Sequence, residues 1–277
     1  MLVLVLLGLC LGSFVNAAVW RFHEQQKLKK KGKKPRFTPQ DLSISRGRSL
    51  CPRCGHQLAS RDLVPVLSWI MLRGRCRYCH KAISWQYPFV ELLAAVLFVV
   101  SYIFWPVALQ GSAWVLFGLW LAQVVVLMAL AVYDAHWQLL PTKMIAILAC
   151  TVAPQLLIEA VQAPNIRQWA LNALLAAAIG GGIFEILYRV SNGKWIGGGD
   201  IRLGVWLGLI VGHPIDSFLI IFLASLLGTI LALPWLVRGA LKVSAKLPFG
   251  PLLIVATFIV KLWGGALIDW YMRLVGL

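Results

Sequence analysis

Residues 116–134, LFGLWLAQVVVLMALAVYD, form an apolar run long enough to cross a bilayer and end in the carboxylate of Asp134. Similar runs recur along the whole chain of 277 residues, which is 60% hydrophobic and 13% charged. Soluble domains carry roughly 25% charged residues. The composition therefore excludes a soluble globular domain and predicts an all-α polytopic membrane protein.

We expect about eight transmembrane helices, of which one, at 201–213, is short and tilted or partly re-entrant. The expected spans are 2–20, 87–108, 112–133, 143–161, 168–190, 201–213, 215–237 and 249–268. The first span starts at Met1 without a preceding basic stretch, so we expect an uncleaved helix and not a removed signal peptide. The chain then divides into a first transmembrane helix (1–20), a basic segment (21–86) and a transmembrane core (87–277).

Charge predicts the orientation of these spans. Residues 21–81 hold 16 Lys and Arg against three acids, a surplus of 13 in a chain whose net charge is +16. Because Lys and Arg accumulate on cytoplasmic loops, the segment 21–86 should face the cytoplasm. Alternation through the other spans places 134–142, 191–200 and 238–248 on the same side. We therefore expect a multi-pass membrane protein with these loops in the cytoplasm.

The lysine-rich run at 27–34, KLKKKGKK, has two interpretations. Such a run can bind nucleic acid. Immediately after a membrane helix, however, it more commonly contacts anionic lipid headgroups. We expect anionic lipids as partners here and no nucleic acid.

Two cysteine pairs lie in the basic segment. Cys51 and Cys54 form one CxxC, and Cys76 and Cys79 form a second, 21 residues further on. This spacing is typical of a tetrahedral four-cysteine zinc site. Four thiolates leave no open position, which predicts a structural Zn2+ that helps a small, charged segment to fold.

Asp134 and Asp200 each lie at the end of an apolar run, and the predicted topology places both at the cytoplasmic face. Taken alone, Asp134 could be an interfacial helix-end residue, and Asp200 could be the N-cap of the next helix. Ionisable groups at membrane depth are nevertheless functional candidates. Two carboxylates that share one site are the catalytic groups of aspartic proteases. We interpret them as a catalytic dyad, with Gly197 and Gly199 of the preceding turn supporting the loop or the substrate.

The order of these motifs resembles the type IV prepilin peptidases, also called leader peptidase/N-methyltransferases, which are GxGD membrane aspartic proteases. The resemblance runs nearly end to end. It rests on GLCLGSFVN (8–16), RSLCPRC (48–54), LVPVLSW (63–69), RGRCRYC (73–79), Asp134 with Leu139-Leu140-Pro141, GGGD (197–200) and PFGP (248–251). Thr142 and Arg202 depart from the pattern, which usually has an acidic or amide residue and a lysine at these places.

The resemblance implies a function. The substrates would be prepilins or pseudopilins of type IV pilus or type II secretion systems, cleaved after a glycine at the cytoplasmic face. The new N-terminus would then be methylated with S-adenosylmethionine as the methyl donor. We find no glycine-rich cofactor loop, so the methyl-donor site is not assigned.

We also expect the basic segment and the Asp200 loop to form the substrate entrance, with Asp62, and Glu91 near the membrane, receiving the basic leader. Two rival functions remain. A presenilin-like or signal-peptide-peptidase-like intramembrane protease would also carry a Tyr-Asp and a GxGD, but the cysteine segment and the PFGP argue against it. A non-enzymatic scaffold with a zinc domain would keep its partner after loss of Asp134 or Asp200, whereas an enzyme would lose turnover.

Overall fold

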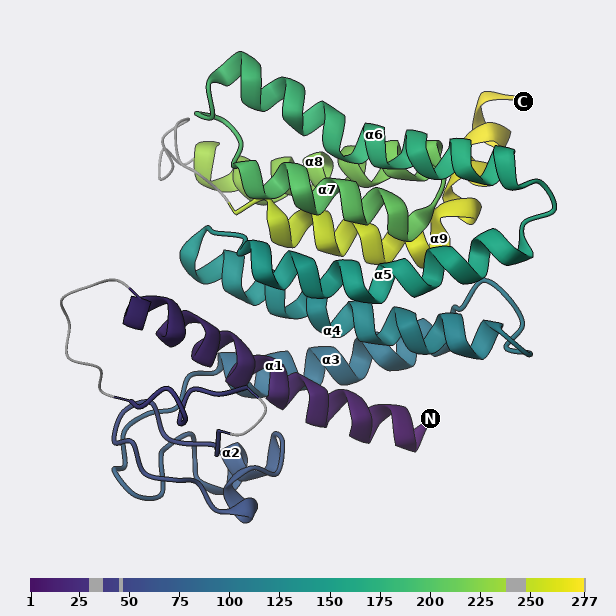
Figure 1. The fold of residues 1–277 in the computed structure, drawn as a ribbon. Helices are drawn as coiled ribbons and strands as arrows, with labels where there is room; N and C mark the ends of the chain where they lie inside the picture. The colour runs from purple at the N-terminus through teal and green to yellow at the C-terminus, as the bar shows by residue number, and fades with distance from the viewer. Residues whose placement is uncertain (30–36, 45–46, 238–247, 277) are drawn as a thin grey trace. The chain divides into compact units, whose positions relative to one another are not determined.

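The computed structural model describes residues 1–29, 37–44, 47–237 and 248–276. Within these ranges the chain is helical and contains no strand, only two isolated bridges. Eight long helices correspond one to one with the eight predicted spans (Figure 1). They are α1 (Leu2–Lys29), α3 (Gln86–Ile103), α4 (Ala113–Trp137), α5 (Thr142–Gln162), α6 (Ile166–Ser191), α7 (Gly198–Val211), α8 (Pro214–Val237) and α9 (Gly250–Val275). A one-turn 3-10 helix (Ser60–Asp62) and the short α2 (Leu67–Met71) lie between α1 and α3.

Seven of the described helices are long and apolar enough to cross a membrane. The exception among the eight is α7, which has 14 residues. At 1.5 Å per residue it extends about 21 Å, less than the hydrocarbon core of about 30 Å. This agrees with the short span expected at 201–213, and the fold class predicted from the sequence is confirmed.

The chain forms two compact units, Met1–Ile103 and Phe104–Leu277. In the first unit, α1 and α3 are in close contact because α1 carries glycines where the two helices meet. A Cβ at Gly8 would lie 2.6 Å from the Cα of Ala95, and a Cβ at Gly12 would lie 2.7 Å from the Cα of Glu91. Asn16, one turn further along α1, donates a 3.2 Å hydrogen bond to the Tyr87 carbonyl. The motif at 8–16 is therefore a helix-packing surface.

The second unit is built around a contact between α6 and α7. A Cβ on Gly180 would collide with the Gly204 carbonyl, and one on Gly208 would collide with the Ala176 carbonyl. The two backbones therefore touch, as small residues permit in membrane helices. A Cβ on Gly181 would collide with the Val205 side chain of α7, whereas Gly182 faces open space.

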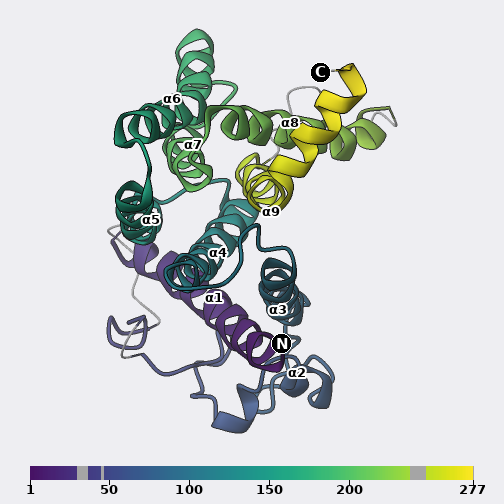
Figure 2. The same cartoon turned by 90° about the vertical axis from the view of Figure 1, so that its right-hand side faces the viewer.

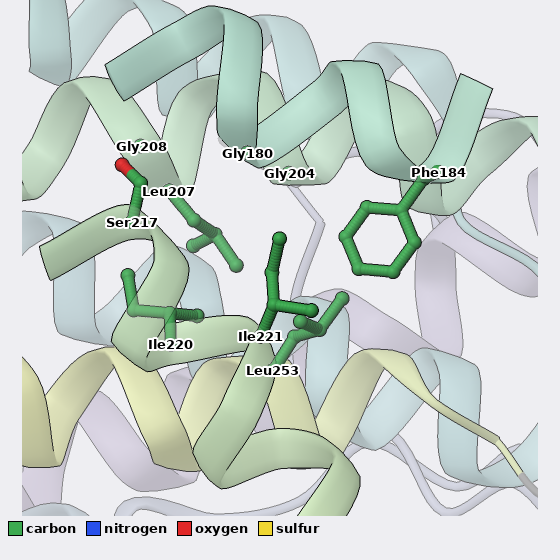
Figure 3. A pocket seen from close by; sticks show the side chains of 9 residues that line it. All are labelled: Gly180, Phe184, Gly204, Leu207, Gly208, Ser217, Ile220, Ile221 and Leu253. Atoms are coloured by element: carbon green, nitrogen blue, oxygen red, sulfur yellow. The ribbon is translucent and has the colours of Figure 1, made fainter. Parts of the chain in front are cut away.

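A small cavity lies where α6, α7, α8 and α9 meet (Figure 3). Its lining is Gly180, Phe184, Gly204, Leu207, Gly208, Ser217, Ile220, Ile221 and Leu253. The Ser217 hydroxyl is buried and has no hydrogen-bond partner among the described residues. With one hydroxyl in an otherwise apolar lining, the cavity offers no binding site for a polar substrate.

The motif-bearing ends of the second unit's helices lie together. Figure 1 shows the C-terminal end of α4 and the starts of α5, α7 and α9 on the left. Figure 2 looks along α5 and α7, which are in contact. This arrangement brings residues of the 134–141, 197–200 and 248–251 motifs to one end of the unit.

Candidate active site and metal centre

Asp134 lies in the last turn of α4, which continues to Trp137 and is followed by Gln138 in a left-handed conformation. Its side chain is buried, with 5% of the residue exposed. The backbone amide of Gly250 hydrogen-bonds to the Asp134 carboxylate. A Cβ at Gly250 would lie 2.7 Å from Asp134 Oδ2, so only glycine leaves room here for the carboxylate. The PFGP motif at 248–251 therefore forms one wall of the Asp134 site.

Asp200 is the third residue of α7, and Gly197 is the N-cap. The Asp200 carboxylate accepts a 3.2 Å hydrogen bond from the Gly197 backbone N–H. Asp200 is therefore not the N-cap that the sequence left open as an alternative. At the third position of the helix, Asp200 instead directs one carboxylate oxygen back to the start of its own helix.

The two aspartates interact electrostatically. The pKa of the Asp200 carboxyl is raised to about 6, first by burial and second by the charge of Asp134. Two close carboxylates disfavour double ionisation, because each raises the free energy of the other's charged form. A pair in which one group holds a proton while the other is ionised can perform both acid and base steps.

Gly199 supports the loop by contact with the other aspartate motif. A Cβ at Gly199 would lie 2.7 Å from the Cβ of Leu140, in the turn that follows Asp134. A Cβ at Gly198 would meet nothing within 4 Å. Gly198 and Gly199 are helical residues of the first turn of α7, which begins earlier than the predicted start at 201. Gly199 thus fits the side of α7 against the Asp134 turn, and Gly198 leaves the neighbouring surface open.

A hydrogen bond also joins the two motifs. Arg202 Nη1 donates to Thr142 Oγ1 over 2.7 Å. Arg202 lies two residues after Asp200, and Thr142 is the first residue of α5. These are the two positions at which the sequence departs from the expected pattern, and the structure pairs them with each other.

The four cysteines converge in the first unit. Their sulfur atoms lie within 4.8 Å of one another, and Cys51 and Cys79 are 4.0 Å apart. Tetrahedral zinc with Zn–S bonds of 2.3 Å needs sulfur atoms about 3.8 Å apart. The cluster therefore fits one metal ion with four thiolate ligands. Cys54 and Cys76 complete the set.

The two cysteine turns repeat one hydrogen-bond pattern. Cys51 N donates to the His56 carbonyl and Gly55 N to the Cys51 carbonyl, at 2.9 and 2.8 Å. Cys76 and His80 repeat these bonds in the second turn. Gly55 and His80 both have positive φ, 78° and 54°, so a histidine occupies the left-handed position in the second turn.

Asp62 and Glu91 are not available to receive a basic leader, contrary to the sequence-based expectation. The Asp62 side chain is 3% exposed and pairs with Arg77 Nε at 2.7 Å and with the Tyr78 hydroxyl at 3.0 Å. Glu91 is 6% exposed and accepts a 2.7 Å bond from Val66 N. Both acids hold the cysteine segment together, and their partners are too distant in sequence for pattern reasoning to have found them.

A polar cluster at the other end of the second unit was also missed. The Ile210 carbonyl, in the last turn of α7, accepts from Lys261 Nζ at 2.8 Å and from Gln155 Nε2 at 3.0 Å. Gln155 also donates to Glu159 at 2.8 Å and accepts from Gln123 at 2.7 Å. These bonds cap α7 at its C-terminal end, where a cation is favourable. Isolated polar residues on three different helices gave no sequence signal.

Comparison with known proteins identifies the family. Residues 6–105 match the model of the Bacterial Peptidase A24 N-terminal domain, and residues 121–233 match that of the Type IV leader peptidase family. A prepilin leader peptidase/N-methyltransferase of Xanthomonas campestris pv. campestris is 31% identical to the chain over 98% of this chain and 94% of the relative. The chain belongs to the type IV leader peptidase family.

Other relatives have similar names. The prepilin leader peptidase/N-methyltransferase of Bacillus subtilis is 28% identical over 98% of both chains. The type 4 prepilin-like proteins leader peptide-processing enzyme of Escherichia coli is 34% identical over 89% of this chain and 87% of its own. No solved structure matches. The N-terminal family match contains all four cysteines and the second match contains Asp134 and Asp200, so the predicted resemblance is confirmed.

Proposed function

We propose that the chain is a prepilin leader peptidase in which Asp134 and Asp200 form the catalytic dyad. The observation that carries the proposal is that the structure brings the two aspartate motifs together, with Gly199 against Leu140, and that the charge of Asp134 acts on the Asp200 carboxyl 66 positions further along the chain. Membership of a peptidase family supports it, and so do the relatives' names. The substrates are prepilins or pseudopilins, cleaved after a glycine at the end of the leader.

The chemistry follows from two carboxyl groups that share one charge. The ionised aspartate takes a proton from a water molecule, which attacks the scissile carbonyl. The protonated aspartate donates a hydrogen bond to the carbonyl oxygen and stabilises the negative charge that develops there. No acyl-enzyme forms. The pair titrates as a unit, so the roles of Asp134 and Asp200 are assigned jointly.

We extend the proposal to methylation of the new N-terminus with S-adenosylmethionine, because the relatives that span nearly the whole chain are named peptidase/N-methyltransferases. Incubation of the purified protein with a prepilin and methyl-labelled S-adenosylmethionine tests this. Label should enter the mature pilin and not the uncut precursor. Label in the precursor, or none in the cleaved product, would contradict this part of the proposal.

In the cell, the protein would lie in the bacterial cytoplasmic membrane with the aspartate end facing the cytoplasm. The excess of Lys and Arg at 21–81 supports this orientation. Anionic lipids would contact the run at 27–34, most of which lies outside the described residues. The cysteine cluster would hold Zn2+ through Cys51, Cys54, Cys76 and Cys79, where the ion would fix the two turns together without an open position for catalysis.

The decisive experiment uses three Asp→Asn variants in reconstituted vesicles with a prepilin substrate. Asp134→Asn and Asp200→Asn should each abolish cleavage, because an amide can replace neither the base nor the acid. Asp216→Asn is the matched control, since Asp216 lies at the start of α8, at the opposite end of the unit. Cleavage by either dyad variant at the wild-type rate would refute the proposal. So would a substrate-bound structure with the carboxylates more than about 8 Å apart, beyond one bridging water.

A further inference from the structure

The short helix α2 presents an apolar face to its surroundings. Leu67, Ile70 and Met71 are 53%, 58% and 72% exposed, and their spacing places them on one side of the helix. Leu63 and Val64, in the preceding turn, add two more exposed aliphatic side chains. We call these five residues the α2 face. A contiguous apolar surface of this kind marks a site of interaction, unlike single exposed hydrophobic residues.

The structure fixes the α2 face relative to a membrane helix. Val66 N, at the N-cap of α2, donates a 2.7 Å hydrogen bond to Glu91 Oε2. Glu91 is the sixth residue of α3, so α2 begins beside the second turn of α3, about 8 Å along its axis from Gln86. Figure 1 shows α2 near the end at which α3 begins.

The length of α3 determines the depth of this turn in the membrane. The helix has 18 residues and extends about 27 Å, slightly less than the hydrocarbon core of about 30 Å. The whole helix is therefore needed to cross the hydrocarbon core, and its second turn lies inside the headgroup–acyl boundary. Phe89 and Leu92, in the first two turns of α3, are 64% and 50% exposed, as expected for lipid contact. The α2 face lies at the same level.

The residues around the α2 face suit a bilayer surface. Arg73, Arg75 and Lys81 are exposed, and such side chains pair with lipid phosphates. Trp85 is 72% exposed and stacks on Trp69 with ring centroids 4.1 Å apart. Tryptophan is enriched where membrane and water meet. Aliphatic, aromatic and basic side chains together are the composition of segments that lie in the interface.

We propose that the α2 face inserts into the lipid bilayer at the headgroup–acyl boundary on the side where α3 begins. The apolar side chains of the α2 face would then anchor the cysteine segment to the membrane surface. The occupant of the face is lipid. The proposal concerns the first unit alone and does not depend on the peptidase chemistry.

Photo-crosslinking in the full-length protein tests this. A photoreactive amino acid replaces Ile70, and the protein is reconstituted in vesicles of phosphatidylethanolamine and phosphatidylglycerol with an acyl-chain-labelled lipid. The matched control carries the same residue at Arg53, an exposed position in the first cysteine turn. Retained metal at the four cysteines verifies folding of both proteins. We expect labelled lipid adducts at position 70 at least about tenfold above those at position 53.

Two further arms separate insertion from other contacts. In phosphatidylcholine vesicles the adduct at position 70 should persist, because acyl contact needs no headgroup charge. Ile70→Glu should reduce lipid labelling from a photoreactive residue at Met71 severalfold, while Arg53→Glu should leave it unchanged. Equal yields at positions 70 and 53, or an adduct that requires anionic lipid, would overturn insertion. An adduct to a polypeptide in place of lipid would also overturn it and would make the face a protein-docking surface.

Discussion

The guanidinium of Arg202 donates a 2.7 Å hydrogen bond to the hydroxyl of Thr142. This bond ties the first turn of α5 to the first turns of α7, and each of these helices directly adjoins one of the two aspartate motifs. The type IV prepilin peptidase pattern has an acidic or amide residue and a lysine at these two places. The chain therefore departs from the pattern at both members of one contact, and in this chain a hydrogen bond joins them.

This pairing predicts coupled effects. Thr142→Val removes the acceptor while keeping the side-chain shape, so it should slow cleavage by up to about tenfold, the equivalent of one partly exposed hydrogen bond to a charged group. Thr142→Asp combined with Arg202→Lys should recover most of the rate, because an ion pair replaces the bond. Cleavage rates of Thr142→Asp, of Arg202→Lys and of the variant that combines them form a double-mutant cycle. Additive effects would show that the two residues act independently.

Gly199 and Gly198 should respond differently to substitution. Gly199→Val brings a branched side chain against Leu140 and should displace the start of α7 from the Asp134 turn, lowering cleavage by about tenfold or more. Gly198→Ala adds a methyl group in open space and is the structural control, which should fold and melt like the wild type. Cleavage assays and thermal melting in detergent measure both effects. Wild-type cleavage by Gly199→Val would exclude close packing at this point.

Asp200 predicts a dependence of stability on pH. Its folded-state pKa of about 6 lies above the ordinary value near 3.9, so the folded protein binds this proton more tightly than the unfolded chain does. The stabilisation is complete below about pH 4 and is lost as pH rises through 6. Asp200→Asn keeps a side-chain acceptor for Gly197 and removes the buried charge. It should therefore melt at a higher temperature than the wild type above pH 6, with a smaller difference near pH 4. Identical melting curves at pH 8 would contradict the shifted pKa.

Metal content tests the cysteine centre. Cys51→Ser with Cys76→Ser removes one ligand from each pair, so bound zinc in the purified protein should fall to background and the segment from 47 to 85 should become sensitive to protease. Cys10→Ser with Cys150→Ser is the matched control, because both cysteines are exposed on helices away from the cluster. Elemental analysis measures zinc directly. Undiminished zinc in the first pair of substitutions would exclude the four-thiolate site.

Periodicity and spacing predicted the helices and the cysteine cluster because these depend on local sequence. An apolar run specifies its own helix, and a CxxC pair specifies its own turn. The partners of single polar side chains could not be predicted in this way. Nothing in the sequence indicated a partner for Asp62, yet Arg77 and Tyr78 both donate hydrogen bonds to its carboxylate. Lys261 lies within an apolar run, and its acceptor, the Ile210 carbonyl, belongs to a helix 51 positions earlier.

The surroundings of the two aspartates could be predicted only in part from the sequence. Their position at a common end of the membrane core was predictable from motif and topology, but the contacts of the neighbouring glycines were not. Gly250 appeared in the sequence only as part of PFGP, whereas the structure places its backbone directly on the Asp134 carboxylate. Gly199 was expected to support the loop or the substrate, and the structure adds the neighbour that it approaches, Leu140. Neither contact was predictable because a glycine signals close approach without identifying what approaches.

The shortness of α7 has a consequence for the access of water. Its two polar ends, Asp200 and the Ile210 carbonyl with its Lys261 partner, are separated by about 15 Å of helix, roughly half the thickness of the hydrocarbon core. The helices α5, α6, α8 and α9 contact α7, and Gly198 and Arg202 are its exposed residues. An ionisable group at such a depth is favourable where it faces the interior of the helix bundle or a space that water fills. We expect hydrolytic water to meet the proposed dyad at the start of α7, so that a peptide bond beside an apolar helix can be cut without a channel through the protein.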